Sequence, residues 1–369
     1  MATQVVFIVN LLRQARCIRR INDFIDRGYS VKVYGFDRAG DSRQTPNFQY
    51  TVLDIIDNKT SYSSRLVMMV QCIRQVIKNE PSNSLFYLFN LDVALASTLT
   101  FKRFKYCYEI SDLMELEQSN LFLLKALTGV NRFLMSRSKV NVFTSEGFLK
   151  YYYPKKELAK NVVLSNKLNR NCLQLPFPPE SEFNPSNIKF SFTGALRGES
   201  LFRFVKVISD MNMHEIHLYG IFSDDKMEPL FKDILNKSGN VFYHGPFKNP
   251  ADFPDIYKNN NIVICYYYSN KNDVYLEPNK LFEAIFYEKP IVVSNNTFLG
   301  DKVRELNVGY VIDGDTEEKI KSFIDQITIE NYKEKVLAER RIPKDDSVDN
   351  PDLLFKTIQS LNLFQKELR

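Results

Sequence analysis

Several features that mark common protein classes are absent from this chain of 369 residues. It contains no run of 18 uncharged apolar residues, so we expect no membrane-spanning helix. The apolar stretch at 4–12 follows no basic segment and leads to no small-residue cleavage site, so we expect no signal peptide. The five cysteines are scattered, odd in number and without metal-ligand spacing. This usage favours a reducing cytoplasm with buried thiols.

Short catalytic and cofactor-binding motifs are also absent. No Gly-x-Gly-x-x-Gly follows the first apolar stretch, where residues 9–13 read VNLLR, and this argues against an NAD or FAD enzyme. There is no Walker loop, no His-Glu-x-x-His and no Gly-x-Ser-x-Gly. The three histidines, His214, His217 and His244, have no metal-ligand spacing. We therefore expect neither a metal site nor a cofactor.

Charge is distributed unevenly along the chain. Residues 1–165 carry 23 Lys and Arg against 14 Asp and Glu, a net +9, whereas the remainder carries 26 against 30, a net −4. The basic half predicts an anionic partner such as a membrane surface or a phosphorylated lipid. Nucleic acid is a weaker candidate, because we find no helix-turn-helix, zinc-finger spacing or RNP-like aromatic signature.

The alternation of apolar strands and helical patterns predicts an α/β fold. Each half of the chain repeats this alternation, which is typical of a parallel sheet covered by helices on both faces. The proline-rich segment 177–185 separates the halves. We expect two doubly wound, Rossmann-like domains at 1–175 and 186–340 that face each other across a cleft. A C-terminal helix within 345–369 would pack back on the first domain.

The polar stretch from Val274 to Ser294 is the first candidate site. It predicts a loop, a helix that opens near Asn279, and a short apolar strand after the Lys-Pro pair at 289–290. Glu277, Lys280 and Glu283 follow one another at intervals of three, which places them on roughly the same side of a helix. Such a group suits a ligand with phosphates and sugar hydroxyls. Surface salt-bridge pairing on a solvated helix is the alternative.

A second polar cluster follows the first strand of the second half. Gly194 and Gly198 allow close approach of the backbone to a ligand, and Arg197 supplies a planar cation for phosphate oxygens. Arg197 and Lys280 together would neutralise a diphosphate without a metal. A tight strand-to-helix turn with an exposed arginine is the alternative.

Together these clusters resemble the donor domain of GT-B glycosyltransferases of the family 4 type. The resemblance rests on four segments in order: GALR at 194–197, HGP at 244–246, PNKLFEA at 278–284 and KPIV at 289–292. The first half is similar, more weakly, to the acceptor domain of that family. The similar segments there are GYSV at 28–31 and VFTSE at 142–146.

The resemblance implies roles for individual residues. Glu283 matches the second glutamate of the family's paired motif, which contacts the nucleotide ribose, and Arg197 matches the basic residue that faces the donor diphosphate. Tyr275 stands where the first glutamate is expected, eight residues before Glu283. Glu277 lies six residues before Glu283. Either Glu277 takes the place of the first glutamate as a catalytic residue, or the contact to the transferred sugar differs from that in the family.

Further donor contacts and one acceptor residue follow from the same comparison. We assign donor binding to the following residues: Gly194, Arg197, His244, Asn279, Lys280, Leu281 and Glu283. His244 corresponds to a position facing the base, although a loop-stabilising role is the stronger alternative. Asp112, just past a strand end, would polarise the acceptor hydroxyl as a catalytic residue, with helix capping as its alternative.

Two basic helical stretches predict contact with an acceptor or a membrane. The first carries Arg16, Arg19 and Arg20, and the second, at 121–139, combines apolar residues with Lys125 and Arg132. The second would dock in the headgroup region of anionic lipid. A core helix with a basic rim is the alternative.

The combined interpretation is a glycosyltransferase of the hexosyltransferase type. It would move a sugar from a UDP or GDP sugar to a lipid-linked or polysaccharide acceptor, with retention and without a metal. We expect a role in bacterial cell-envelope polysaccharide biosynthesis (capsule, O-antigen or exopolysaccharide) and a cytoplasmic location, peripheral on the inner face of the plasma membrane. The alternatives are a nucleotide-sugar epimerase or hydrolase on the same fold, and a non-catalytic subunit that binds sugar nucleotide.

Overall fold

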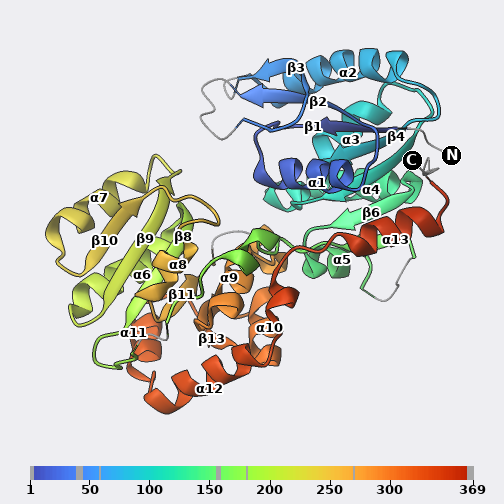
Figure 1. Cartoon of the computed structure of the whole chain (residues 1–369). Coiled ribbons are helices and arrows are strands. Elements are labelled where there is room, and N and C mark those ends of the chain that lie inside the picture. Colours follow the sequence, from blue (N-terminus) through green and yellow to red (C-terminus); the bar gives the residue numbers. More distant parts are fainter. Residues whose placement is uncertain are drawn as a thin grey trace. The chain divides into compact units, whose positions relative to one another are not determined.

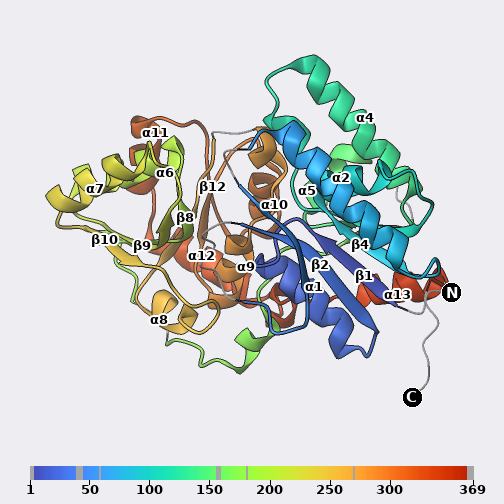
Figure 2. The ribbon, with the colours of Figure 1, turned by 90° about the horizontal axis from the view of Figure 1, so that it is seen from above.

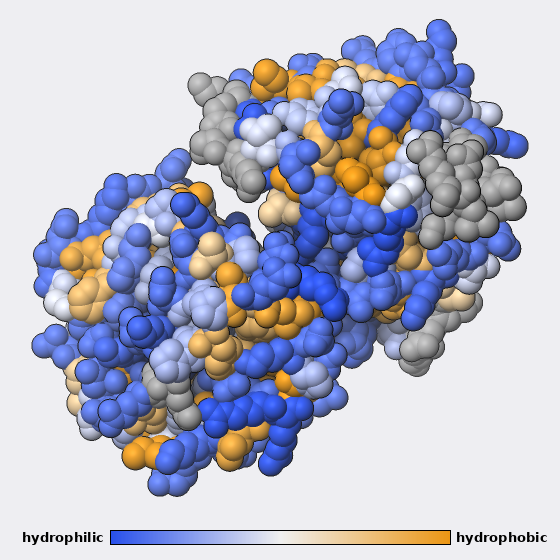
Figure 3. Space-filling view, viewed as in Figure 1, coloured by the Kyte–Doolittle hydropathy of each residue, from blue (hydrophilic) through white to orange (hydrophobic). Residues whose placement is uncertain are grey.

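The computed structural model describes residues 4–38, 45–57, 60–154, 159–179, 182–268 and 271–363. The chain divides into two compact units, each a parallel sheet covered by helices (Figure 1). The first unit comprises residues 1–165 and 350–369, and the second comprises residues 166–349. On the face shown in Figure 3, hydrophilic side chains cover most of the surface and apolar patches lie between them.

The first unit is built on a parallel sheet with the strand order β3-β2-β1-β4-β5-β6-β7 among its described residues. β1 and β4 are buried along their whole length, as expected for central strands covered on both faces. The chain reverses the direction of strand addition between β1 and β4, and this is the switch point where doubly wound sheets bind ligands. The elements are β1 (Val5–Val9), α1 (Ala15–Asp26), β2 (Val31–Arg38), β3 (Thr51–Ile56), α2 (Tyr62–Asn79), β4 (Leu85–Phe89), α3 (Asn90–Thr98), β5 (Lys105–Ile110), η1 (Met114–Glu117), α4 (Leu121–Arg137), β6 (Val140–Phe143), α5 (Glu146–Tyr152) and β7 (Asn161–Val163).

The last helix of the chain, α13 (Asp352–Ser360), belongs to the first unit. Leu354, Phe355 and Ile358 join the core that α1 and the sheet form. The Phe355 ring lies 4.7 Å from the ring of Phe24, and the Arg27 guanidinium stands 4.2 Å above it. The helix lies within the predicted range 345–369, and residues 364–369 lie outside the described part of the chain.

The second unit has a sheet with the strand order β10-β9-β8-β11-β12-β13, also parallel. Two apolar clusters cover the two faces of this sheet. Its elements are η2 (Arg170–Gln174), β8 (Lys189–Leu196), α6 (Glu199–Met211), β9 (Glu215–Phe222), α7 (Glu228–Lys237), β10 (Val241–Gly245), α8 (Phe253–Lys258), β11 (Ile262–Cys265), η3 (Lys271–Tyr275), α9 (Asn279–Tyr287), β12 (Ile291–Ser294), α10 (Phe298–Leu306), β13 (Gly309–Ile312), α11 (Glu317–Asp325), α12 (Ile329–Arg340) and η4 (Lys344–Ser347).

Helix α9 begins and ends where its sequence predicts. Pro278 is its N-cap residue, and Glu288 ends it with a left-handed φ of +56° before the Lys-Pro pair. Every residue from 281 to 287 is buried, so α9 is an internal helix. A solvated helix with surface salt bridges is therefore excluded for this segment.

The helices differ in how far they are buried. α4 extends along the outer side of the first unit (Figure 2), and only three of its residues are fully buried. None of the helices within the described residues combines the length and the apolar character needed to cross a membrane. The first helix, α1, begins at Ala15, and the turn at residues 12–13 before it buries Leu12.

Candidate donor site and acceptor-side residues

Two glycines bring the backbones of β8 and β9 together at their carboxyl ends. Gly194 pairs with Gly220 in the parallel register, and their φ angles are +123° and +140°. A Cβ on Gly220 would stand 1.7 Å from the carbonyl oxygen of Gly194, and a Cβ on Gly194 would stand 3.3 Å from Nζ of Lys280. The absence of a side chain at Gly194 therefore makes room for the lysine at the strand end, and its absence at Gly220 lets the two backbones approach.

The ammonium of Lys280 is held over this glycine by aromatic groups. It donates a hydrogen bond of 3.2 Å to the hydroxyl of Tyr267 and lies 4.5 Å from the centre of the Phe192 ring. Burial lowers the pKa of Lys280, but Tyr267, Cys265 and Glu283 raise it, and the resulting pKa lies above the usual lysine value. Lys280 is therefore cationic at neutral pH, and it forms no ion pair with another described residue.

Glu283 lies one turn further along α9 and is 4% exposed. Its Oε2 accepts hydrogen bonds from Thr193 Oγ1 at 2.7 Å and from the Tyr257 hydroxyl at 2.5 Å. Both bonds fall on the same oxygen, so Oε1 receives no hydrogen bond from the described residues. The carboxylate is thus fixed in position and keeps one oxygen available as an acceptor.

Arg197 follows β8 directly and is exposed. Within the described ranges it has no hydrogen bond and no ion pair. Burial raises the pKa of Tyr267 to about 12, and the charges of Lys280 and Arg197 both act against this rise. α6 and α9 also begin without a side-chain cap at Gly198 and Pro278, which leaves amide N–H groups for an anion.

The other residues predicted beside Lys280 have different environments. The carboxylate of Glu277 is completely buried and forms an ion pair with Lys302 of α10. Leu281 is fully buried in the core, and its assignment as a donor contact stays a prediction. Asn279, the first residue of α9, is exposed, and Tyr275 ends η3.

His244 lies on the outer strand β10, in a group of stacked rings. Its Nε2 is 3.0 Å from Nδ1 of His217, whose Nε2 is 3.2 Å from a carboxylate oxygen of Glu215. The ring also stacks on Tyr219 at 4.4 Å. Burial lowers the pKa of both histidines. Within the part of the chain that the structure describes, no group of three or more His, Cys, Asp or Glu could hold a metal ion.

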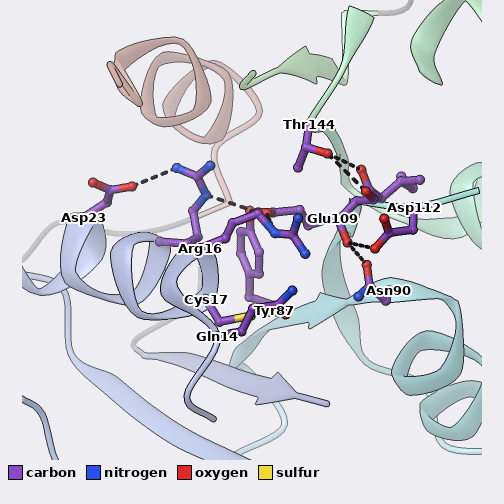
Figure 4. A network of polar contacts seen from close by, with 12 residues as sticks. Gln14, Arg16, Cys17, Asp23, Tyr87, Asn90, Glu109, Asp112 and Thr144 are labelled. Atoms are coloured by element: carbon purple, nitrogen blue, oxygen red, sulfur yellow. Dashed lines mark hydrogen bonds and ion pairs between the residues drawn. The ribbon is translucent and has the colours of Figure 1, made fainter. Parts of the chain in front are cut away.

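In the first unit, Asp112 lies just past the carboxyl end of β5. It accepts a hydrogen bond of 3.2 Å from Ser111, whose hydroxyl also donates to Asn90 at the end of β4. Thr144, after β6, bonds to the backbone carbonyls of residues 110 and 111 (Figure 4). Asp112 is thus part of a polar network across three neighbouring strand ends.

Two residues at the switch point were missed in the sequence interpretation. Asn10, directly after β1, donates to Asp92 at 3.4 Å, and its own Oδ1 is buried without a hydrogen bond in the described part of the chain. Burial raises the pKa of Asp92. The available signal was that Asn10 is the first polar residue after a wholly apolar strand, and no comparable signal marks Asp92.

The arginines of α1 are anchored to a buried glutamate. Glu109 is fully buried on β5, where its Oε2 accepts hydrogen bonds from Arg20 Nε at 3.1 Å and from the Tyr87 hydroxyl at 2.5 Å. Arg16 Nε lies 3.6 Å from the other carboxylate oxygen (Figure 4). Arg20 is 2% exposed and also pairs with Asp23. It is therefore an internal ion-pair residue, and a membrane contact at Arg20 is excluded.

The remaining basic residues lie nearer the surface. Arg19 of α1 is half-buried, whereas Lys125 and Arg132 of α4 are exposed. The alternative of a core helix with a basic rim does not describe α4, because Leu121, Phe122 and Phe133 are also exposed.

Comparisons with known proteins give relatives only at the level of structure. No protein-family model matches the sequence, and no curated protein matches it. The structure is similar to sucrose-phosphate synthase from Thermosynechococcus elongatus, with a TM-score of 0.67, 12% identity, and coverage of 97% of this chain and 98% of that one. It is also similar to WaaG, a glycosyltransferase involved in lipopolysaccharide biosynthesis, with a TM-score of 0.65, 13% identity and coverage of 97% and 99%.

A third similar structure contains ligands. Anabaena Alr3699/HepE in complex with UDP and glucose has a TM-score of 0.67 and 12% identity, with coverage of 98% of this chain and 100% of that one. Identities this low show a shared fold and leave the activity to be argued from the site. Across nearly its whole length, the chain has the two-domain GT-B fold of these proteins.

Proposed function

We propose that the protein is a glycosyltransferase that transfers a hexose from a nucleoside-diphosphate sugar, UDP or GDP linked, to a lipid-linked or polysaccharide acceptor. The observation that carries the proposal is the pair of cations at the carboxyl edge of the second sheet. Arg197 directly follows β8 and Nζ of Lys280 lies beside Gly194 of the same strand, and neither cation has an ion-pair partner among the described residues. A diphosphate supplies the charge that this edge lacks.

The donor chemistry follows from these side chains. As the bond between the sugar and the diphosphate breaks, negative charge grows on the leaving phosphate, and Lys280, Arg197 and the uncapped start of α9 stabilise it. Glu283 accepts hydrogen bonds from the ribose hydroxyls through Oε1. This mechanism needs no metal. The resemblance to family 4 enzymes suggests that the reaction retains configuration at the anomeric carbon.

The acceptor side is proposed to be the first unit. Asp112 would accept a hydrogen bond from the acceptor hydroxyl and increase its nucleophilicity. Ser111 and Asn90 would position that carboxylate. Glu277, the other predicted catalytic carboxylate, forms an ion pair with Lys302, and we assign no acceptor-activating role to it.

A place in cell-envelope polysaccharide synthesis, at the inner face of the plasma membrane, is part of the same proposal. WaaG acts in lipopolysaccharide biosynthesis, and the first half of this chain has a net charge of +9, which suits a phosphorylated lipid acceptor.

A binding experiment tests the donor site before the acceptor is known. Thermal shifts and calorimetry with UDP, GDP, CMP and ADP sugars would be compared for the wild type, Arg197→Ala and Lys280→Met. We expect one base to bind and each substitution to weaken binding at least tenfold, because each removes a charge-assisted contact. Lys319→Met, at an exposed position of α11, is the matched control. Unchanged binding in both site variants would refute the assignment.

The alternatives give different products. An epimerase or hydrolase would convert the donor without any acceptor, and a non-catalytic subunit would bind the donor and neither transfer nor hydrolyse the sugar. Product analysis with donor alone, and then with envelope lipids, separates the three.

A further inference from the structure

The exposed face of α4 has an organisation that the donor chemistry does not explain. Four residues form an apolar strip along it at intervals of four, three and four: Phe122, Ala126, Gly129 and Phe133. These intervals place them on one line along a helix. All four are exposed, Phe122 at 82% and Phe133 at 52%. Nothing lies within 4 Å of a Cβ built on Gly129, so the strip is uncovered.

Cations flank this strip, and no acidic residue occurs in 121–139. Lys125 and Arg132 lie on one side of it and Arg137 on the other, and all three are exposed. The Arg137 guanidinium lies 5.0 Å from the centre of the Phe133 ring. Exposed aromatic and aliphatic residues bordered by cations are complementary to an anionic lipid surface, where the rings enter the acyl boundary and the cations meet phosphate groups.

The opposite face of α4 is fixed to the fold by a buried polar group. Asn131 accepts a hydrogen bond from Tyr108 at 2.5 Å and donates to Glu115 at 3.1 Å and to Tyr152 at 2.8 Å. Leu134 and Met135 complete the buried face. The orientation of the helix is therefore set, and the strip must point outward.

We propose that the strip and its flanking cations, defined by Phe122, Lys125, Ala126, Gly129, Arg132, Phe133 and Arg137, bind an anionic membrane with α4 parallel to its surface. This goes beyond the donor chemistry, and it names the surface from which a lipid-linked acceptor is taken. α4 leads from the end of η1 to the start of β6, so it begins at the sheet edge that carries Asp112. A bilayer on α4 would present lipid headgroups at that edge.

The lack of tryptophan in the chain permits a direct test. Phe122→Trp and Phe133→Trp each introduce a single fluorophore at the strip, and Leu337→Trp introduces one at a position of α12 that is equally exposed, at 52%. With phosphatidylcholine vesicles containing 30% phosphatidylglycerol, we expect a blue shift and quenching by brominated acyl chains for the first two variants. The α12 variant should show neither.

Sedimentation with the same vesicles measures the contribution of each part. Phe122→Ser with Phe133→Ser should lower the partition coefficient at least tenfold. Lys125→Gln with Arg132→Gln and Arg137→Gln should lower it on the order of 100-fold. Added salt should also lower the partition coefficient of the wild type. The controls make matching changes at exposed positions of the second unit: Ile329→Ser with Leu337→Ser, and Lys319→Gln with Lys321→Gln and Lys333→Gln.

The outcomes separate this proposal from the proposed transferase. Sugar-nucleotide affinity should be unchanged in all α4 variants, and vesicle binding needs no donor. Equal sedimentation of wild type and strip variants would overturn the membrane proposal. It would also be overturned if the wild type bound no vesicles but formed a dimer that Phe122→Ser with Phe133→Ser dissociates, because the strip would then be a contact between two copies.

Discussion

Nζ of Lys280 lies directly over the backbone of Gly194: a Cβ atom on that glycine would stand 3.3 Å from the ammonium nitrogen. The two residues are 86 positions apart in the sequence, and the parallel pairing of β8 with β11 and the packing of α9 bring them together. The glycine also has a φ of +123°, which residues with a side chain rarely adopt. Position 194 therefore favours glycine for two reasons: a side chain would contact the ammonium of Lys280, and the backbone has a positive φ.

Gly194→Ala should weaken donor binding because the new methyl group displaces Lys280. Strain at the positive φ should also destabilise the protein by about 1–3 kcal/mol. We expect at least tenfold weaker binding of the preferred nucleoside diphosphate by calorimetry, measured well below the melting temperature. Gly239→Ala is the control, since a Cβ there meets nothing within 4 Å, and it should bind normally. Normal binding by the Gly194 variant would show that the lysine does not contact the ligand.

Glu283→Gln should separate recognition of the nucleoside from recognition of the diphosphate. A hydrogen bond to a charged group contributes about 1.5–3 kcal/mol, so we expect roughly 10- to 100-fold weaker binding of UDP or GDP. Binding of inorganic pyrophosphate should be unchanged, whereas Arg197→Ala should weaken both. Competition titrations with the two ligands give the comparison. Parallel losses for UDP and pyrophosphate in the Glu283 variant would contradict a ribose contact.

The sequence predicts the central strands better than the buried charges. Apolar runs such as residues 5–9 and 85–89 appear as central strands, because only a covered parallel sheet buries every residue of a run. Lys280 and Glu283 stay predicted donor contacts, which rest on their spacing along one side of a helix and on the resemblance to the donor motif. The motif did not show that the side chain of Leu281 is buried, because a motif does not show which side of a helix faces the core. Glu109 was missed, since its partners lie far away in the sequence, on α1 and β4.

Glu109→Gln should destabilise the first unit strongly. The substitution removes the buried anion that Arg16, Arg20 and Tyr87 share, and breaking a buried ion pair from one side costs about 3–5 kcal/mol. Glu146→Gln removes one partner of the surface pair with Lys150 and should cost about 0–1 kcal/mol. Urea unfolding followed by circular dichroism measures both variants. Similar free energies of unfolding for the two would show that the internal network is not stabilising.

Glu339 is a buried carboxyl group that, unlike Glu109, has no hydrogen-bond partner among the described residues. Glu339 of α12 is 1% exposed, and neither of its carboxyl oxygens has a hydrogen bond from the described residues. Burial raises its pKa well above the usual glutamate value, and Glu288 raises it further, while Lys289 and Arg340 act in the opposite direction. The folded state therefore binds a proton at Glu339 more tightly than the unfolded state does.

Glu339→Gln should stabilise the protein relative to the wild type, and this stabilisation should be larger at alkaline pH than at acidic pH. The stability that Glu339 contributes by holding its proton is complete below the unfolded pKa and is lost as pH rises through the folded pKa. The neutral amide avoids this loss, so its free energy of unfolding should exceed that of the wild type at pH 8, and the difference should shrink toward pH 4. Urea unfolding across this range, with Glu305→Gln at an exposed position of α10 as the control, measures it. A difference independent of pH would show that the pKa of Glu339 is the same in the folded and the unfolded protein.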